Sequence, residues 1–359
     1  MTNETKIIAF HLPQFHSFPE NDEWWGNGFT EWTNVRKAKP LFAGHNQPRI
    51  PLNDNYYNML DYKTRKWQAE LAKKYGIDGF CYYHYWFNGK LLMEKPLESL
   101  LLEKDIDISF CLCWANEPWT RAWDGKASAV LMPQHYGDEP EWEKHLNYLM
   151  QFFKDERYIK IDNAPMYILY RSNSIPRCNE MVKYWEKLCK EQGFSGIHIV
   201  EELNGFQNKP VCNDSKAVLE FQPTCAEKQK GRFRWQIDKL KSWMHTKTKG
   251  YTSGVYTIDF ESVWKRIINM PVPGYAGKKA YLGGFVGWDN SPRKRKAGIF
   301  TGNTPEIFRK YLTLLLKKAK ANDSEYIFLN AWNEWGEGAY LEPDTTNKYA
   351  YLEAVIKSK

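Results

Sequence analysis

Eight short apolar runs recur along the chain, and stretches with helical spacing lie between them. The apolar runs are residues 6–13, 79–87, 106–114, 166–170, 198–202, 217–222, 281–288 and 326–329. Helical patterns cover residues 64–75, 93–102, 141–153, 179–192 and 305–320. Buried strands that alternate with helices are typical of a parallel sheet, and eight units are the number that closes a (β/α)8 barrel. We therefore predict an α/β protein, a TIM barrel with long βα loops, in which residues 1–359 form a single domain.

Polar and aromatic residues gather where the apolar runs end. These residues are His11, Tyr85, Trp86, Asn116, Glu117, Glu201, Glu202, Trp288, Asp289, Glu334 and Glu337. The beginnings of the same runs show no such accumulation. Active sites of barrels of this kind lie at the carboxyl-terminal ends of the strands. We therefore predict the functional site at that rim.

The segment after the last apolar run carries two carboxylates among indoles. Glu334 and Glu337 are three residues apart, Asn333 precedes the first, and Trp332 and Trp335 surround it. An indole offers a flat apolar face to a sugar ring, and a pair of carboxylates can divide the acid and base work of glycosidic bond cleavage. The alternative is a solvated turn, which a helix with acidic residues in its first turn could follow. The tryptophans favour carbohydrate chemistry, with Glu334 and Glu337 as the catalytic residues.

Asn116 and Glu117 form a second candidate group. Pro118 follows them and prevents the strand from continuing. The pair could hold a sugar hydroxyl, or Glu117 could act as an acid or base, and the alternative is a capping role. The full set of predicted substrate-binding residues is Asn333, Trp335, Asn116, Glu117, Trp114, His11, Tyr85, Trp86, Trp25, Trp288 and Asp289.

Residues 14–51 contain an aromatic segment, Glu23-Trp-Trp-Gly-Asn-Gly-Phe-Thr-Glu-Trp32, without a regular pattern. A loop of this length is uncommon in a compact domain and is usually functional. Aromatic residues make up 16% of the chain, which is more than a core needs. We therefore predict that this loop is a wall of an aromatic cleft.

Two basic patches, at residues 246–250 and 293–297, stand out in a chain whose net charge of +7 is modest for its length. Short basic runs are typical of solvated loops, so we predict no nucleic-acid partner. The patches leave open a peripheral contact with an anionic membrane surface or with a lipid-linked or acidic glycan.

The cysteine and histidine positions predict neither a disulfide framework nor a metal site. Several of the seven cysteines, including Cys81, Cys111 and Cys113, lie within apolar runs, which is typical of reduced core residues. No Cys-x-x-Cys pair is present, and Pro13 separates His11 from His16. Serine-elbow, phosphate-loop and dinucleotide motifs are missing from the sequence, so we predict no cofactor.

The first residues run directly into an apolar strand, without the pattern of a signal peptide. No run approaches the ~20 apolar residues of a transmembrane helix. A cytoplasmic location is expected if the chain starts at its natural Met.

Several sequence blocks together resemble the WbsX family, which is usually described as polysaccharide-biosynthesis glycosyltransferases. The blocks begin with Phe10-His-Leu-Pro-Gln-Phe-His16, continue through residues 21–35, 38–42, 79–86 and 114–121, and end with Asn330-Ala-Trp-Asn-Glu-Trp-Gly-Glu-Gly338. That family is similar to the family 99 glycoside hydrolases, the endo-α-mannosidases, which are (β/α)8 barrels. The blocks run from the first strand to the last, so the resemblance covers nearly the whole chain.

The resemblance implies roles for both acids. Glu334 and Glu337 match the Glu-Trp-x-Glu-Gly segment of the endo-α-mannosidases. There the first carboxylate is thought to act as base on the neighbouring 2-hydroxyl, giving a 1,2-anhydro sugar with retention. The second is thought to act as general acid and then as base, and Asn333 would be a substrate-binding neighbour. Gly336 stands where those enzymes generally carry His.

Three functions remain open from the sequence. The first is a retaining glycosidase-like enzyme that acts on a bacterial surface polysaccharide or its precursor. The second is a glycosyltransferase of lipopolysaccharide, O-antigen or capsule biosynthesis, although the one Asp-x-Asp in the sequence, Asp105-Ile-Asp107, leads into the start of the third strand. The third is a barrel that binds glycans without catalysis.

Overall fold

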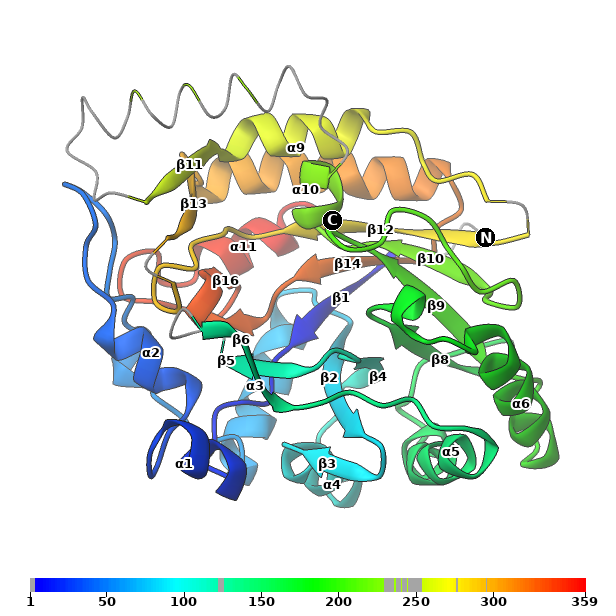
Figure 1. The fold of residues 1–359 in the computed structure, drawn as a ribbon. Coiled ribbons are helices and arrows are strands. Elements are labelled where there is room, and N and C mark those ends of the chain that lie inside the picture. Colours follow the sequence, from blue (N-terminus) through cyan, green and yellow to red (C-terminus); the bar gives the residue numbers. More distant parts are fainter. Residues whose placement is uncertain are drawn as a thin grey trace.

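The computed structural model describes residues 4–121, 126–228, 254–275, 277–294 and 296–359, together with positions 236, 240 and 244. Eight parallel strands form a closed barrel, which confirms the predicted architecture (Figure 1). In order around the barrel they are β1 (Lys6–His11), β2 (Gly79–Phe87), β4 (Ser109–Trp114), β8 (Ala164–Leu169), β9 (His198–Leu203), β10 (Ala217–Glu220), β12 (Lys279–Phe285) and β14 (Tyr326–Asn330). The ring closes where β14 pairs with β1, with Ala9 opposite Leu329.

Helices cover the outside of the barrel (Figure 1). They include α3 (Tyr62–Lys74), α4 (Lys95–Leu102), α5 (Glu139–Phe153), α6 (Cys178–Glu191), α7 (Thr224–Lys228), α9 (Phe260–Asn269), α10 (Pro305–Ala321) and α11 (Ala350–Ile356). The longest, α10, starts where the Thr304 side chain accepts a hydrogen bond from the Ile307 amide, and it buries Phe308, Leu312 and Leu315. The five helices predicted from spacing are present, with ends that differ by one or two residues.

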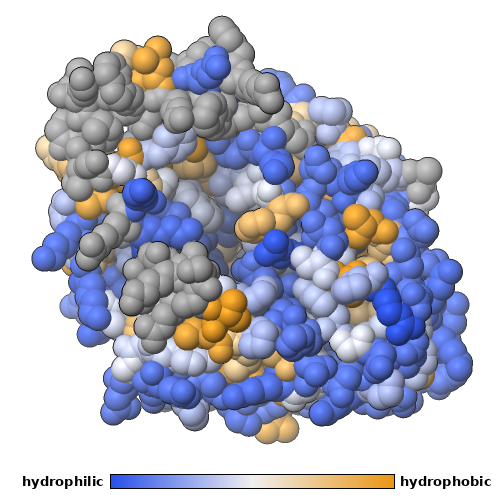
Figure 2. Space-filling model, viewed as in Figure 1, coloured by the Kyte–Doolittle hydropathy of each residue, from blue (hydrophilic) through white to orange (hydrophobic). Residues whose placement is uncertain are grey.

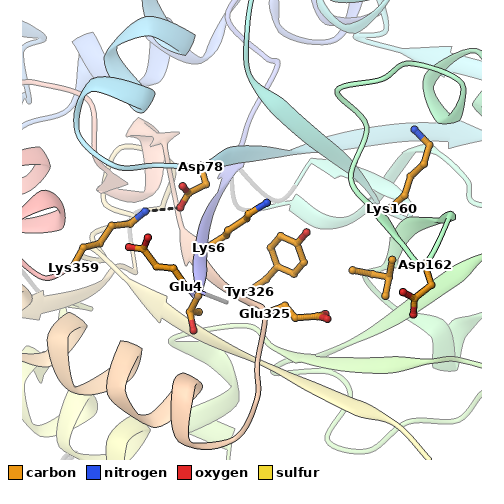
Figure 3. Close-up of a pocket in the computed structure, with 10 residues that line it drawn as sticks. Glu4, Lys6, Asp78, Lys160, Asp162, Glu325, Tyr326 and Lys359 are labelled. Carbon is orange, nitrogen blue, oxygen red and sulfur yellow. Dashed lines mark hydrogen bonds and ion pairs between the residues drawn. The ribbon is translucent and has the colours of Figure 1, made fainter. Parts of the chain in front are cut away.

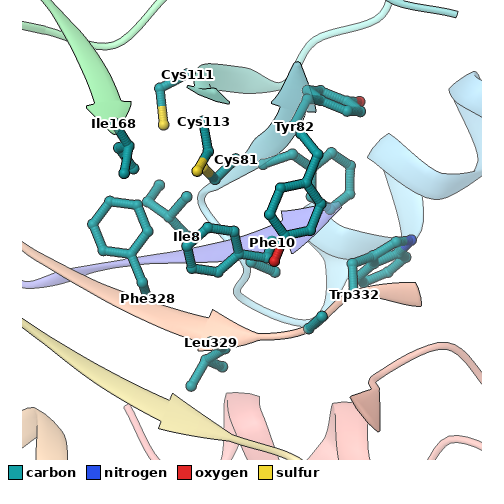
Figure 4. Close-up of a cluster of buried hydrophobic side chains, with 14 of the residues drawn as sticks. Ile8, Phe10, Cys81, Tyr82, Cys111, Cys113, Ile168, Phe328, Leu329 and Trp332 are labelled. Atoms are coloured by element: carbon teal, nitrogen blue, oxygen red, sulfur yellow. The ribbon is translucent and has the colours of Figure 1, made fainter. Parts of the chain in front are cut away.

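The barrel interior is filled by side chains from several of its strands (Figure 4). Ile8 and Phe10 of β1 lie near Phe328 of β14, and the Phe10 and Phe328 ring centroids are 5.9 Å apart. Cys111 and Cys113 of β4 belong to the same buried cluster. All seven cysteines are buried and free, as predicted for reduced core residues.

The first long loop is more regular than predicted. Two short helices, α1 (Pro19–Trp25) and α2 (Glu31–Lys37), lie within residues 14–51, so the expectation of a loop without regular structure is wrong. Each helix has only 7 residues, too few to show a helical period in sequence. Local signals fix them instead: Pro19 begins α1, and Thr30 and Thr33 form a reciprocal cap at the start of α2.

Residues 254–273, for which the sequence predicts no element, also contain regular structure. β11 (Tyr256–Asp259) leads into α9 and pairs with β13 (Gly298–Thr301). The basic patch predicted at residues 246–250 lies outside the described residues.

Short antiparallel pairs extend the carboxyl-terminal ends of the barrel strands. β3 (Lys90–Leu92) folds back on β2, and β5 (Trp119–Arg121) pairs with β6 (Lys126–Met132) after β4. β15 (Asn333–Glu334) pairs with β16 (Ala339–Tyr340) after β14. A further pair, β7 (Lys160–Ile161) with β8, lies at the opposite end of the barrel.

Charged residues also collect at the amino-terminal ends of the strands, contrary to expectation. A pocket of about 380 Å³ there is lined by residues that include Glu4, Lys6, Asp78, Lys160 and Glu325 (Figure 3). Asp78 accepts hydrogen bonds from the Ile7 amide and the Lys359 ammonium, each at 2.7 Å. These contacts tie the start of β1 to the C-terminal residue, a stabilising role typical of this end of a barrel.

Within the described part of the chain, no helix is both long enough and apolar enough to cross a membrane.

Candidate active site

A cleft of about 440 Å³ opens at the carboxyl-terminal ends of the strands. Its lining comprises Leu12, Gln14, Tyr83, Tyr85, Ala115, Glu117, Pro118, Trp119, Thr120, Tyr170, Phe206, Phe221, Thr224, Trp288, Arg293, Lys294, Glu334 and Glu337. Figure 2 shows the molecule in the same view as Figure 1, with small apolar patches among predominantly hydrophilic residues. The cleft thus combines aromatic walls with a few charged groups, a composition suited to a polar ligand with apolar faces.

Glu334 lies deep in this cleft. β14 ends at Asn330, and the chain then turns into β15, which carries Glu334 on the cleft side. Its side chain is only 9% exposed. Burial raises the pKa of Glu334 to about 8, the charges of Glu337 and Glu31 add to the rise, and Arg293 opposes it. Burial therefore keeps the proton on Glu334 to a higher pH than on an exposed glutamate.

Glu337 belongs to the 3₁₀ turn Trp335–Glu337 that follows. Gly338 ends this turn in the left-handed region, with φ of 61°, a conformation that glycine adopts without strain. The Glu337 side chain is 26% exposed and lines the cleft. The two predicted catalytic carboxyls therefore share one cleft but differ in exposure to solvent.

Arg293 joins the two carboxyls. Its Nη2 lies 3.1 Å from Oε2 of Glu334, and its Nη1 lies 2.9 Å from Oε1 of Glu337. Its Nε donates to Oε1 of Glu31, the first residue of α2, at 2.9 Å. One buried guanidinium therefore contacts three carboxyl groups.

The position of Arg293 corrects the interpretation of the basic patch at 293–297 as a solvated loop. The guanidinium is 8% exposed and lies within the cleft wall. A basic run indicates charge but not direction, and here its first member turns toward buried acids in two other segments of the chain. Arg295 lies outside the described residues.

Three of the predicted substrate-binding residues line the cleft: Glu117, Tyr85 and Trp288. Glu117 accepts from Nη1 of Arg171 at 3.0 Å. The Tyr85 ring meets the Trp119 ring edge to face, with centroids 5.3 Å apart. These side chains lie where a ligand in the cleft would contact them.

The two predicted asparagines instead bind backbone. Oδ1 of Asn333 accepts from the Leu12 amide at 2.7 Å, and its Nδ2 donates to the Leu12 carbonyl at 3.0 Å. Asn116 makes the same pair of contacts with the Arg171 amide and carbonyl, at 2.8 and 2.9 Å. Both side chains are buried, so each amide holds a strand end and does not face the cleft.

Three predicted tryptophans and His11 are packed inside the protein. Trp335 stacks on Tyr340 with centroids 3.8 Å apart, and Trp114 and Trp86 are also buried. His11 is fully buried, which lowers its pKa to about 3, and its Nε2 lies 3.1 Å from Oε1 of Gln68. None of these four side chains is among those that line the cleft.

Asp289 and Trp25 also lie away from the cleft lining. The buried Asp289 carboxylate accepts from His45 at 2.8 Å and Gln47 at 2.7 Å, and it contacts Arg49 at 3.4 Å. These partners hold the pKa of Asp289 below its usual value and fasten the first long loop to the seventh barrel strand. Trp25 is half-buried at the end of α1 and packs near Phe29.

The sequence interpretation missed several residues of this site. Arg293 and Glu31 belong to the charged cluster, while Trp119, Tyr170, Phe206 and Phe221 form much of the aromatic lining. Trp119 could have been selected, because it follows Asn116 and Glu117 directly after Pro118. Glu31 gave no such signal, because a single acid in an aromatic loop is usually exposed. No group of metal-ligating side chains comes together among the residues that the structure describes.

Comparison with known proteins places the chain in a family. Residues 7–355 match the family described as "Glycosyltransferase WbsX". A protein of Xanthomonas campestris pv. campestris, described as "Uncharacterized protein WxcX", is 34% identical over 354 residues. That match covers 97% of this chain and 48% of the relative, so the chain spans about half the length of the curated relatives it matches.

Solved structures share the fold. A "Glycoside hydrolase-like protein" superposes with a TM-score of 0.61 and 12% identity, covering 100% of this chain and 95% of that one. The GH99 endo-alpha-mannosidase from Bacteroides thetaiotaomicron gives a TM-score of 0.54 and 11% identity, covering 99% of this chain and 97% of that one. Because the family match covers almost its full length, the chain belongs to the WbsX glycosyltransferase family.

Proposed function

We propose that the protein is a carbohydrate-active enzyme that acts on glycosidic bonds of a bacterial surface polysaccharide or its precursor, with retaining glycosidase-like chemistry. The observation that carries this proposal is the position of Glu334 and Glu337 in one aromatic cleft, on one guanidinium. Their environments differ, and paired acids with different environments can take the separate acid and base roles that such chemistry requires.

The roles follow the endo-α-mannosidase resemblance. Glu334 takes the proton of the sugar 2-hydroxyl while that oxygen attacks C1, and Glu337 protonates the departing glycosidic oxygen. In the second step Glu337 removes a proton from water, which attacks C1 and opens the 1,2-anhydro ring, and the 2-oxygen regains a proton from Glu334. A raised pKa makes ionised Glu334 a stronger base than an ordinary carboxylate.

The aromatic lining supports an oligo- or polysaccharide as the substrate. Tyr85 and Trp119 lie on one part of the lining, while Trp288 and Phe206 belong to other loops. Flat rings of this kind bind the C–H faces of sugars, and the carboxyls and Arg293 supply polar partners for hydroxyl groups. Contact with a lipid-linked glycan, a cytoplasmic location and a single domain over residues 1–359 stay predictions.

A glycosyltransferase is the second candidate, because the family description favours it. The Asp-x-Asp segment does not support a glycosyltransferase, because it does not line the cleft. Asp105 and Asp107 precede β4, and they pair with Lys66 and Lys73 on α3. These aspartates are therefore at the other end of the barrel.

Incubating the purified protein with O-antigen, capsular polysaccharide and α-mannan tests the proposal. We expect release of reducing ends, reduced by about 10²-fold or more in Glu334→Gln and in Glu337→Gln, since each variant removes an acid-base group. Glu220→Gln is the matched control, because Glu220 is a buried carboxyl whose charge neighbour is Lys318 of α10. Consumption of a sugar nucleotide only with an acceptor would instead identify a transferase, and binding without turnover would identify a glycan-binding barrel.

A further inference from the structure

The contact between Glu31 and Arg293 fills the space beside Gly336. A Cβ atom at position 336 would lie 1.7 Å from Oε1 of Glu31 and 2.7 Å from Nε of Arg293. Real Cβ atoms do not approach other heavy atoms so closely. A side chain at position 336 would therefore require the Glu31 carboxyl and the Arg293 guanidinium to move from the positions in which they contact each other.

Glu31 is also an electrostatic partner of the catalytic pair. It is 0% exposed, and it shares the Arg293 guanidinium with Glu334 and Glu337. If all three acids were ionised, one positive charge would face three negative charges in a largely buried space, which is costly. Burial raises the pKa of Glu31 and of Glu334, so the cluster tends to retain a proton.

The second carboxyl oxygen of Glu31 strengthens this interpretation. Oε2 is buried and has no hydrogen-bond partner among the residues that the structure describes. Only Oε1 contacts Arg293, so the charge of Glu31 is compensated through that guanidinium. The charge of Glu31 and those of the catalytic acids therefore compete for the same cation.

We infer that Glu31 is a positioning residue that shares Arg293 with Glu334 and so controls the charge of Glu334, and that Gly336 leaves the space in which Glu31 reaches Arg293. Glu31 neither lines the cleft nor needs to touch a sugar. An effect of Glu31 on the reaction rate rests on the proposed function, whereas the charge coupling between Glu31 and Glu334 does not.

Several ionisable groups other than Glu31 also lie near Glu334. Arg293 and Glu337 contact or face Glu334 directly, and Glu117 and Lys294 line the same cleft. Tyr83 and Tyr85 of β2 also lie close enough to interact. Burial raises the pKa of both tyrosines above its usual value, so they stay neutral in the range where Glu334 titrates.

Carbon-13 NMR of protein labelled at the glutamate carboxyl carbons tests the coupling without substrate. The resonance lost in Glu334→Gln identifies Glu334, and we expect it to titrate near pH 8. In Glu31→Gln a negative charge is removed, so Arg293 stabilises ionised Glu334 more effectively. The titration midpoint of Glu334 should therefore fall by about one pH unit or more.

Glu220→Gln is the matched control, since it replaces a buried carboxyl outside the Arg293 cluster and should leave that midpoint in place. An unchanged midpoint in Glu31→Gln, or an equal change in the control, would overturn the inference. If the wild-type protein cleaves no polysaccharide while Glu31→Gln shows the expected NMR shift, the proposed function alone is overturned.

A thermal-unfolding cycle tests the steric part of the inference and applies even if Glu31→Gln folds poorly. Gly336→Ala should lower the Tm of the wild-type protein, because the new methyl group collides with the Glu31 carboxyl. In a Glu31→Ala background the same change should lower the Tm by less, since the nearest colliding atom is gone and Arg293 no longer has the partner that holds its Nε beside Gly336. Equal losses in the two backgrounds would show that Gly336 is needed for another reason.

Discussion

Glu334 is buried and also contacts a guanidinium, and these two features act on its charge in opposite directions. Burial favours the neutral acid, while the Arg293 contact at 3.1 Å favours the carboxylate. Burial has the larger effect, and the nearby Glu337 and Glu31 reinforce it, so the pKa of Glu334 rises to about 8. A residue in this state can serve as base only in the fraction of molecules that has lost the proton.

This property predicts the pH dependence of the reaction. The proposed mechanism needs ionised Glu334 and protonated Glu337, so kcat/KM should follow a bell-shaped pH profile in which one limb reports the Glu334 pKa of about 8. The measurement is the initial rate of reducing-end release from pH 5 to 9.5. A profile without a limb near pH 8 would show that the protonation of Glu334 does not control the reaction.

Strand ends at the cleft are held by side-chain amides. Asn333 of β15 binds both backbone groups of Leu12, which follows β1, and Asn116 binds both backbone groups of Arg171, which follows β8. In each case the amide takes the place of a neighbouring strand at the point where regular pairing stops. These asparagines therefore position the segments that carry Glu334 and Glu117.

Removal of one such amide should destabilise the protein. Asn333→Ala leaves the amide and carbonyl of the buried Leu12 without these partners, at a cost of about 2–4 kcal/mol in the free energy of unfolding. Urea unfolding followed by tryptophan fluorescence measures the loss. The exposed Asn46 makes one side-chain hydrogen bond at 3.3 Å, so Asn46→Ala is the control and should change stability by less than about 0.5 kcal/mol. Similar losses in the two variants would contradict this role for Asn333.

At the scale of the whole molecule, the barrel and its functional rim could be predicted because eight apolar runs alternate with helical patterns along the chain. The position of Glu334 and Glu337 followed from their place after the last strand. The direction of individual side chains could not be predicted, because periodicity does not show whether Asn116 or Trp335 faces a ligand or the interior. The contact between Arg293 and Glu31 joins two segments that are more than 250 residues apart in the chain. No local sequence pattern encodes a contact of this kind.

The central claim is that Glu334 and Glu337 serve one glycosidic linkage, and a crystal structure of the Glu337→Gln variant with a bound polysaccharide fragment tests it most directly. We expect a sugar 2-hydroxyl within ~2.6–3.2 Å of the Glu334 carboxyl, and the glycosidic oxygen at a similar distance from the residue at 337. A glycan bound with both side chains still turned toward Arg293 and away from the linkage, or bound outside this cleft, would contradict the claim.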